Sequence, residues 1–289
     1  MTIGFAQVGT ESDWRTAFSS DMKAEAGRRG IILLFADADN DAQRQRLQVL
    51  GFVAAHVDAI VLAPVVVSGW ADTLQTVRAA GIPVFLVDRA VDADPSLFVA
   101  RIAADFNLEG RLAGAWLAQA TLGTCGILEL QGSVGSEPTI QRHKGFLAVI
   151  SQFPNMRILH SVGGDFTNDG GRQAMEGLIR TDGLKDICAV WSHNDNMILG
   201  AIAAMHAAGL HPGRDQLMVS VDGVPDIFKA MLAGDSNMSV ELKSDIGKYI
   251  FDVVQGYLGG RRDYPKWVLI PSALHTPADA AAALASRGF

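Results

Sequence analysis

Short apolar runs alternate with segments of helical periodicity along most of the 289 residues. Residues 81–89 (GIPVFLVDR) show the repeating unit: a turn glycine, a proline, a continuous apolar run, and then an acid beside a base. An unbroken apolar run that follows a helical pattern is typical of a strand buried on both faces of a parallel sheet. Repetition of this unit predicts an α/β fold with doubly wound parallel sheets.

The alternation runs through the chain twice. In the first part, strands are predicted at 3–8, 31–36, 58–63, 82–87 and 98–103, with helices at 14–29, 40–56 and 69–80. After a helix that starts at residue 105, strands are predicted at 125–131, 157–163, 187–192 and 216–221, with helices at 137–153, 168–180, 195–208 and 225–233. A strand at 237–241, a helix at 243–258, a strand at 266–270 and a helix at 276–286 follow. These last elements exceed a second copy, so the chain is expected to cross between two domains more than once.

Composition narrows the classes of partner. The net charge of −7 and the pI near 5.4 argue against a nucleic-acid partner. The longest apolar runs, such as residues 59–67, are too short to cross a bilayer, so no direct membrane insertion is expected. No histidine or cysteine spacing suits a metal, and residues 132–135 lack the Gly-Lys-Ser/Thr of a phosphate loop. We therefore expect no metal and no cofactor. The first residues lead directly into a strand, so we expect no signal peptide within this sequence.

An aspartate follows an apolar strand in each half: Asp88 in VFLVDR and Asp222 in LMVSVDG. Ligands of open α/β sheets bind outside the carboxyl ends of the strands, so facing sheets would bring both aspartates into one cleft. A carboxylate accepts hydrogen bonds and the neighbouring Arg89 donates several, which suits a polyol. The alternatives are a surface ion pair for Asp88 and Arg89, and a turn residue before Gly223 for Asp222.

Several segments, in order along the whole chain, carry a family resemblance: 82–89 (IPVFLVDR), 102–110 (IAADFNLEG), 127–132 (ILELQG), 141–146 (QRHKGF), 164–167 (GDFT), 192–202 (SHNDNMILGAI), 220–226 (SVDGVPD) and 239–242 (SVEL). With them the chain resembles the periplasmic sugar-binding proteins of the ribose-binding type. FAQVGTESDWR and APVVVSGW look most like the galactofuranose-binding branch. The resemblance implies the type I fold of periplasmic binding proteins, with two α/β domains, 1–104 plus 242–270 and 105–241 plus 271–289. Three crossovers near 103–105, 240–242 and 270–272 would form the hinge.

The same resemblance implies a function and a set of contacts. The chain would be the solute-binding receptor of a sugar ABC importer, a periplasmic monomer that delivers a neutral monosaccharide to a membrane permease. A furanose is expected, with galactofuranose first and arabinofuranose next. The ligand-binding residues carried over by motif are Trp14, Arg15, Asp88, Arg89, Arg142, Phe166, Asn194, Asp222 and Glu241. Phe106 and Glu241 replace an asparagine and a glutamine that are usual in the ribose-binding pattern, which argues against ribose.

Other interpretations stay open for single residues. Trp14 and Phe166 are also typical core residues, Asn194 is well placed to cap a helix, and Arg142 could be an exposed helix arginine. Among function classes, a nucleophile-elbow motif is absent, and a glycosidase built on Asp88 and Asp222 would need a protonated acid where arginines favour ionised ones. We therefore expect no enzyme. The sugar-sensing domain of a regulator that lacks its DNA-binding part is the main alternative.

The two cysteines, Cys125 and Cys188, each begin a predicted strand. If the second domain has the strand order 2-1-3-4, these strands are neighbours about 4.8 Å apart, which suits a disulfide bond. An even cysteine count in an exported protein favours the bond, and two buried thiols are the alternative.

Overall fold

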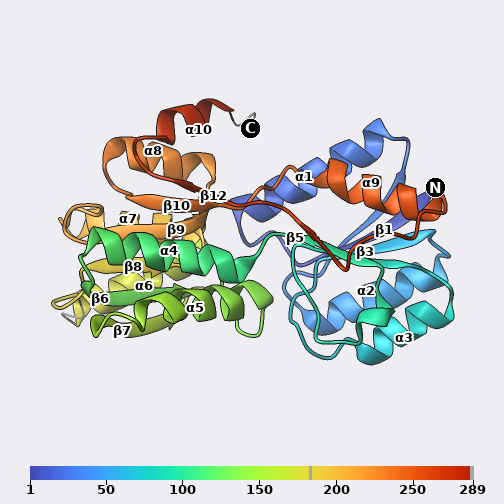
Figure 1. Ribbon diagram of the computed structural model, residues 1–289, viewed down its shortest axis with the longest axis horizontal. Helices are drawn as coiled ribbons and strands as arrows, with labels where there is room; N and C mark the ends of the chain where they lie inside the picture. The colour runs from blue at the N-terminus through green and yellow to red at the C-terminus, as the bar shows by residue number, and fades with distance from the viewer. Residues whose placement is uncertain (182–183, 287–289) are drawn as a thin grey trace. The chain divides into compact units, whose positions relative to one another are not determined.

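The computed structural model describes residues 1–181 and 184–286. Residues 182–183 and 287–289, which belong to the predicted second domain, lie outside the described residues. The chain forms two compact units, each built on its own sheet (Figure 1). Unit 1 comprises Met1–Ala104, Gly135–Glu137 and Ser244–Ile270, and unit 2 comprises Asp105–Val134, Pro138–Lys243 and Pro271–Phe289. These ranges differ from the expected domains at residues 135–137 and 242–243.

Unit 1 is a six-stranded parallel sheet in the order β11-β5-β4-β3-β1-β2. Its strands are β1 (Thr2–Gln7), β2 (Ile32–Asp37), β3 (Ala59–Leu62), β4 (Val84–Val87), β5 (Ala100–Ala103) and β11 (Trp267–Leu269). Its helices are α1 (Asp13–Arg28), α2 (Ala42–Ala54), α3 (Ala71–Ala79) and α9 (Gly247–Leu258), with a 3-10 turn η1 (Pro95–Leu97). Helices α1 and α9 lie side by side on one face of the sheet, and α2 and α3 lie on the other (Figure 1).

The apolar run in residues 81–89 is buried on both faces, as its pattern predicts. Val84 and Leu86 of β4 belong to the cluster that packs under α2 and α3, whereas the Phe85 ring lies 5.7 Å from the Tyr257 ring of α9. Complete burial of such a side chain contributes roughly 1.5–3 kcal/mol. The same α2/α3 face holds Trp70, which is fully buried and donates its Nε1–H to the Val66 carbonyl. Trp70 is therefore a core residue.

Unit 2 repeats the architecture with the order β12-β10-β9-β8-β6-β7. Its strands are β6 (Thr124–Gln131), β7 (Asn155–Gly163), β8 (Ala189–Ser192), β9 (Leu217–Asp222), β10 (Met238–Glu241) and β12 (Ala273–His275). Its helices are α4 (Phe106–Ala120), α5 (Glu137–Ile150, whose first residue groups with unit 1), α6 (Asn168–Arg180), α7 (Asp195–Ala207), α8 (Pro225–Ala233) and α10 (Ala280–Ser286). Within the described residues, no helix is long and apolar enough to cross a membrane. Trp191 of β8 is fully buried and stacks on Phe146 at 4.9 Å, so it is also a core residue.

Three late elements differ from the sequence prediction. Strand β12 was not predicted: it is only three residues long, pairs antiparallel with β10, and so gives too short a run to show a period. Helix α9 begins at Gly247 rather than 243, where the Asp21 carboxylate of α1 accepts its first N–H at 2.6 Å. Helix α10 begins at Ala280 rather than 276, because the Asp279 carboxylate closes a turn onto the backbone N–H of Thr276.

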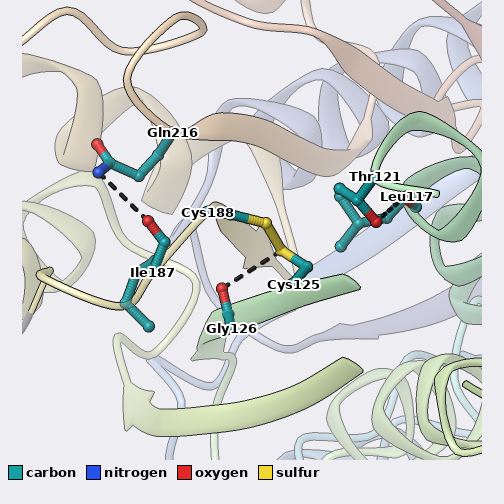
Figure 2. The surroundings of a disulfide bond; sticks show 7 residues. All are labelled: Leu117, Thr121, Cys125, Gly126, Ile187, Cys188 and Gln216. Atoms are coloured by element: carbon teal, nitrogen blue, oxygen red, sulfur yellow. Dashed lines mark hydrogen bonds between the residues drawn. A yellow bond between two sulfur atoms is a disulfide. The ribbon is translucent and has the colours of Figure 1, made fainter. Parts of the chain in front are cut away.

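A disulfide bond ties two neighbouring strands of unit 2 (Figure 2). Cys125 lies at the start of β6, and Cys188 lies immediately before β8, the strand that pairs with β6. Their Cα atoms are 5.5 Å apart, which is an ordinary separation for a disulfide. The bond therefore lies at the amino ends of these two parallel strands.

Candidate functional site

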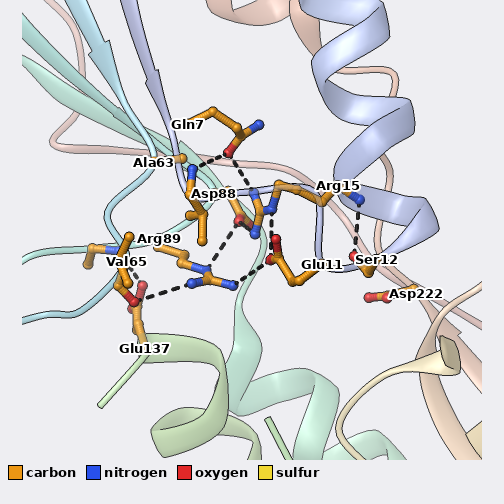
Figure 3. A network of polar contacts seen from close by, with 12 residues as sticks. Gln7, Glu11, Ser12, Arg15, Ala63, Val65, Asp88, Arg89, Glu137 and Asp222 are labelled. Atoms are coloured by element: carbon orange, nitrogen blue, oxygen red, sulfur yellow. Dashed lines mark hydrogen bonds and ion pairs between the residues drawn. The ribbon is translucent and has the colours of Figure 1, made fainter. Parts of the chain in front are cut away.

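The carboxyl ends of β1 and β4 in unit 1 carry a buried cluster of acids and arginines (Figure 3). The Arg15 Nη2 atom lies 2.8 Å from the Asp88 Oδ2 atom, and Arg15 Nε lies 3.3 Å from Glu11 Oε1. Arg89 reaches the same two acids, at 3.4 Å from Glu11 and 3.7 Å from Asp88. The four side chains are at most 4% exposed, so the surface-pair alternative for Asp88 and Arg89 is wrong.

Local capping explains how this cluster is held. Ser12 caps α1 by accepting the Arg15 N–H, so Arg15 lies in the first turn of the helix, within the range 14–29 predicted from sequence. Trp14 lies in the same turn, 4% exposed, where its ring stacks on Phe18 at 5.3 Å. The Arg15 guanidinium lies 4.9 Å from the Trp14 ring. Trp14 is therefore a core residue that also supports Arg15.

Charge balance governs the protonation of Arg15. Complete burial by itself lowers the pKa of Arg15, but the negative charges of Asp88 and Glu11 outweigh it and raise the pKa above the ordinary value. Arg15 is thus charged at all physiological pH values. Two arginines and two carboxylates leave this cluster with no net charge.

In unit 2 the corresponding cluster is organised around Arg142 of α5, which is 2% exposed rather than an exposed helix residue. Its Nε–H donates to Glu109 at 2.9 Å, and its Nη1–H donates to the His193 carbonyl at 2.6 Å. Its Nη2 atom lies 3.8 Å from the Asp222 carboxylate. The guanidinium carbon lies 5.0 Å from the ring of Phe106, the residue that replaces the usual asparagine.

Two glycines bring α4 and α5 close enough for this pairing. A Cβ atom on Gly110 would lie 2.2 Å from the Arg142 carbonyl oxygen, and one on Gly145 would lie 2.0 Å from that of Asn107. Any larger residue would push the helices apart and draw Arg142 away from Glu109. The glycine in the motif Arg-x-x-Gly-Phe is therefore a packing requirement of the arginine that precedes it.

Asp222 and Glu241 lie at the ends of adjacent strands, since they are register partners in the β9–β10 pair. Asp222 is 4% exposed and has a φ of 120°, a backbone angle that L-residues rarely adopt. The Glu241 carboxylate lies 3.1 Å from His275 Nε2, on the strand β12 that the sequence did not reveal.

Asn194 and Phe166 are joined by a hydrogen bond, because Asn194 Nδ2 donates to the Phe166 carbonyl at 2.9 Å. Asn194 also caps α7 by accepting the Met197 N–H, so the capping interpretation holds for its oxygen. The Phe166 ring is 4% exposed and fills the space over Gly132, where a Cβ would lie 1.9 Å from the ring.

Behind Arg142 lies a fully buried acid, Glu129 of β6. It accepts hydrogen bonds from the His193 ring at 3.1 Å, the His143 ring at 2.8 Å and Ser161 at 2.7 Å. Burial by itself raises the pKa of Glu129, but these donors outweigh it and bring the pKa to about 2. Burial lowers the pKa of His193, so near neutral pH a neutral imidazole donates to an ionised carboxylate.

Sequence reasoning missed five buried groups in or around these clusters: Glu11, Glu109, Glu129, His193 and Asp195. All five lie inside segments that carry the family resemblance, which was the available signal: four in the segments of the family and Glu11 in FAQVGTESDWR of the galactofuranose-binding branch. Among the buried polar atoms that have no hydrogen-bond partner in the part of the chain that is described are Glu11 Oε2 in unit 1 and Arg142 Nη2 in unit 2. Such atoms are costly unless something else satisfies them. The described residues contain no group of histidine, cysteine or acidic side chains suited to a metal ion.

Comparison with known proteins identifies the family. The chain matches the family described as "Periplasmic binding protein domain" over residues 3–262. It is 45% identical to the galactofuranose-binding protein YtfQ of Escherichia coli K12, covering 96% of this chain and 88% of that protein.

Two solved structures share the fold closely. The periplasmic binding protein of the arabinose ABC transporter from Shewanella sp. ANA-3, bound to α- and β-L-arabinofuranose, is 49% identical with a TM-score of 0.96, covering 99% of this chain and 95% of that one. A protein from Mycobacterium smegmatis in complex with β-D-fucofuranose is 40% identical with a TM-score of 0.95, covering 99% and 94%. The chain therefore belongs to the periplasmic binding protein family, among the sugar-binding proteins of the ribose-binding type.

Proposed function

We propose that this chain is the solute-binding receptor of a sugar ABC importer and that it binds one neutral furanose with residues from both units. The receptor would work in the periplasm, deliver the sugar to a membrane permease, and leave it chemically unchanged. The relatives with arabinofuranose, galactofuranose and fucofuranose in their names support the furanose ring form.

The observation that carries the proposal is a buried acceptor and a buried donor, neither of which has a hydrogen-bond partner within the described residues. Glu11 Oε2 is an acceptor and Arg142 Nη2 is a donor, each beside charged groups at the carboxyl ends of its own sheet. A sugar hydroxyl both donates and accepts, so a polyol satisfies both kinds of atom, whereas an apolar ligand satisfies neither. Hydrogen bonds to charged groups are also about twice as strong as neutral ones.

We infer the remaining contacts from the same sites. Asp88, Asp222 and Glu241 would accept from sugar hydroxyls, Arg15, Arg89, Arg142 and Asn194 would donate, and Trp14 and Phe166 would border the ring. Because Arg15 and Arg89 are balanced by Asp88 and Glu11, the unit 1 cluster offers an acidic or phosphorylated sugar no free positive charge. A neutral sugar is therefore favoured.

A thermal-shift screen tests the proposal. L-arabinose, D-galactose and D-fucose each contain some furanose at equilibrium, and they would be compared with D-ribose, D-glucose and glucose 6-phosphate. We expect a concentration-dependent rise in the melting temperature with at least one of the first three sugars. The absence of a shift with every neutral sugar would overturn the proposed function. The protein would also be incubated with the aryl furanoside of the best sugar. If no aryl group is released, the result supports a receptor rather than a glycosidase.

A further inference from the structure

A further charged group near the carboxyl ends of the unit 2 strands is Asp195, the first residue of α7. Its side chain is completely buried. Its Oδ1 atom accepts hydrogen bonds from the Ser220 hydroxyl at 2.5 Å and the Ser239 hydroxyl at 2.9 Å, and its Oδ2 atom accepts the Val224 N–H at 2.8 Å. The sequence indicated Asp195 only as the neighbour of Asn194.

The donors to Asp195 surround Asp222 in the chain. Ser220 precedes Asp222 by two residues on β9, and Val224 follows it by two. Ser239 on β10 accepts the Gly223 N–H at 3.2 Å while it donates to Asp195. One carboxylate thus binds residues on both sides of Asp222, through the Ser220 hydroxyl before it and the Val224 backbone N–H after it. That restraint matters because the φ of 120° at Asp222 is unfavourable for a residue with a Cβ atom and persists only where the surroundings enforce it.

We propose that Asp195 is a positioning residue of the sugar site: its buried carboxylate holds the turn at residues 222–224 so that Asp222 keeps the orientation in which it accepts from the sugar. This inference rests on the proposed function. Asp195 itself makes no contact with the ligand in this account, and it acts through the backbone of the turn.

A purely structural role would favour a different residue. Asparagine has nearly the same shape, and it could accept the Val224 N–H and turn its NH₂ group toward the two serine hydroxyls without any buried charge. The charge is expensive: burial raises the pKa of Asp195 to about 6, although the hydrogen bonds from Ser220, Val224 and Ser239 oppose this rise. At neutral pH the carboxylate is still mostly ionised, but burial makes this ionised form less favourable than it is in water. The ionised carboxylate makes stronger hydrogen bonds to the turn at residues 222–224 than a neutral amide would, and we infer that this stronger restraint serves the site.

Charged groups on the surrounding elements are engaged elsewhere. The ion pairs on β9, β10, α6, α7 and α8 are Asp222 with Arg142, Glu241 with His275, Arg172 with Asp169 and Glu176, His206 with Asp235, and Asp226 with Lys229. Arg180 of α6 is exposed. Since histidines in general titrate near the same pH range, the pH dependence of binding is interpreted as a difference between the parent protein and a variant at Asp195.

The test compares Asp195→Asn with Glu25→Gln by calorimetry at about pH 8. Glu25 is also a buried acid, but it lies on α1 of unit 1 and its carboxylate is paired with Arg28 and Arg29. The probes are L-arabinose, D-galactose and D-fucose, and the parent is measured first. We expect Asp195→Asn to bind the best of them at least about tenfold more weakly, although its sugar-free melting temperature equals or exceeds that of the parent. We expect Glu25→Gln to bind as the parent does. Binding by Asp195→Asn within twofold of the parent, or weakening matched by Glu25→Gln, would overturn the proposal.

The parent protein supplies a second test that needs no folded variant. Its affinity for the same sugar should fall as the pH is lowered through about 6, and the backbone amide resonances of Gly223 and Val224 should shift over the same range. A flat affinity and unmoved amide resonances between about pH 5 and pH 8 would overturn the positioning role. If the parent binds none of the sugars, the proposed function fails by itself, and the amide titration still reports whether Asp195 controls the turn.

Discussion

In unit 1 each buried acid of the cluster lies against an arginine, whereas in unit 2 two buried acids are held without an arginine. Asp88 and Glu11 are paired with Arg15 and Arg89. Glu129 relies on imidazole, hydroxyl and amide donors, and Asp195 relies on two hydroxyls and a backbone N–H. The same fold therefore stabilises its buried negative charge in two ways.

The difference has a consequence for how each cluster responds to change. An ion pair is disrupted when either partner is removed, because the other charge is left buried. A buried carboxylate held without an arginine, such as Glu129 or Asp195, has a pKa shifted by its surroundings, so its contribution to stability changes with pH. The stability of unit 1 should thus fall when one charge of its cluster is deleted. The stability of unit 2 should fall when Arg142 is deleted, and it should also depend on pH through Glu129 and Asp195.

The largest effect should come from Arg142→Ala. This change leaves Glu109, which is completely buried, without its arginine, and it also frees the His193 carbonyl. Breaking such a pair costs about 3–5 kcal/mol, so we expect a loss of this size in the free energy of unfolding, measured by urea denaturation.

The matched control is the double variant Arg142→Met with Glu109→Leu, which removes both charges and keeps the volume. It should recover most of the lost stability without recovering sugar binding. Equal instability of the single and double variants would show that the charge pair is not the cause.

The next largest effect should come from removal of the disulfide bond. This bond distinguishes the two units, because both cysteines of the chain belong to unit 2. Linking residues that are 63 apart restricts the unfolded chain by roughly 4 kcal/mol in the chain-entropy model. We expect the variant with Cys125→Ser and Cys188→Ser to lose about 2–4 kcal/mol of stability. Sugar affinity should be unchanged, because the bond lies at the amino ends of the strands. Two free thiols found by titration of the unfolded, unreduced parent would contradict the bond.

The two supporting acids of unit 2 should give pH dependences of opposite sign. The pKa of Asp195 is raised to about 6 in the folded state, so its contribution favours folding below about pH 4 and is lost as the pH rises to about 6. The pKa of Glu129 is lowered to about 2, so its contribution is present above about pH 4.5 and is lost as the pH falls toward 2. Each shift corresponds to about 3 kcal/mol.

Urea denaturation across this pH range measures both contributions. Asp195→Asn should remove the loss of stability between about pH 4 and 6, and Glu129→Gln should remove the gain between about pH 2 and 4.5. Unchanged pH profiles in the two variants would show that these carboxylates do not carry the linkage.

The fold could be predicted from the sequence because its strands are buried on both faces. Continuous apolar runs such as residues 82–87 leave little ambiguity between core and surface, and the alternation with helices fixes a parallel topology. Strand β12 could not be predicted, because a three-residue edge strand has no period and owes its existence to pairing with β10. The starts of α9 and α10 depend on the carboxylates of Asp21 and Asp279, which cap by tertiary or turn contacts.

The candidate site was predictable where a residue follows a strand. Asp88, Arg89 and Asp222 come directly at strand ends, so their position follows from topology alone. The supporting groups were not predictable in this way. Glu129 lies within β6 and Glu109 within α4, where an acid normally faces solvent, and only the packing that Gly110 and Gly145 allow turns Glu109 toward Arg142.

Calorimetric titration of Arg89→Ala and Asp222→Ala beside the parent tests most directly whether the two clusters serve one sugar. One variant alters unit 1 and the other alters unit 2. With the best neutral sugar from the screen, we predict one site per parent chain, and a loss of about 2–5 kcal/mol in binding free energy in each variant. Full-affinity binding by either variant, or no binding of any neutral sugar by the parent, would contradict the account.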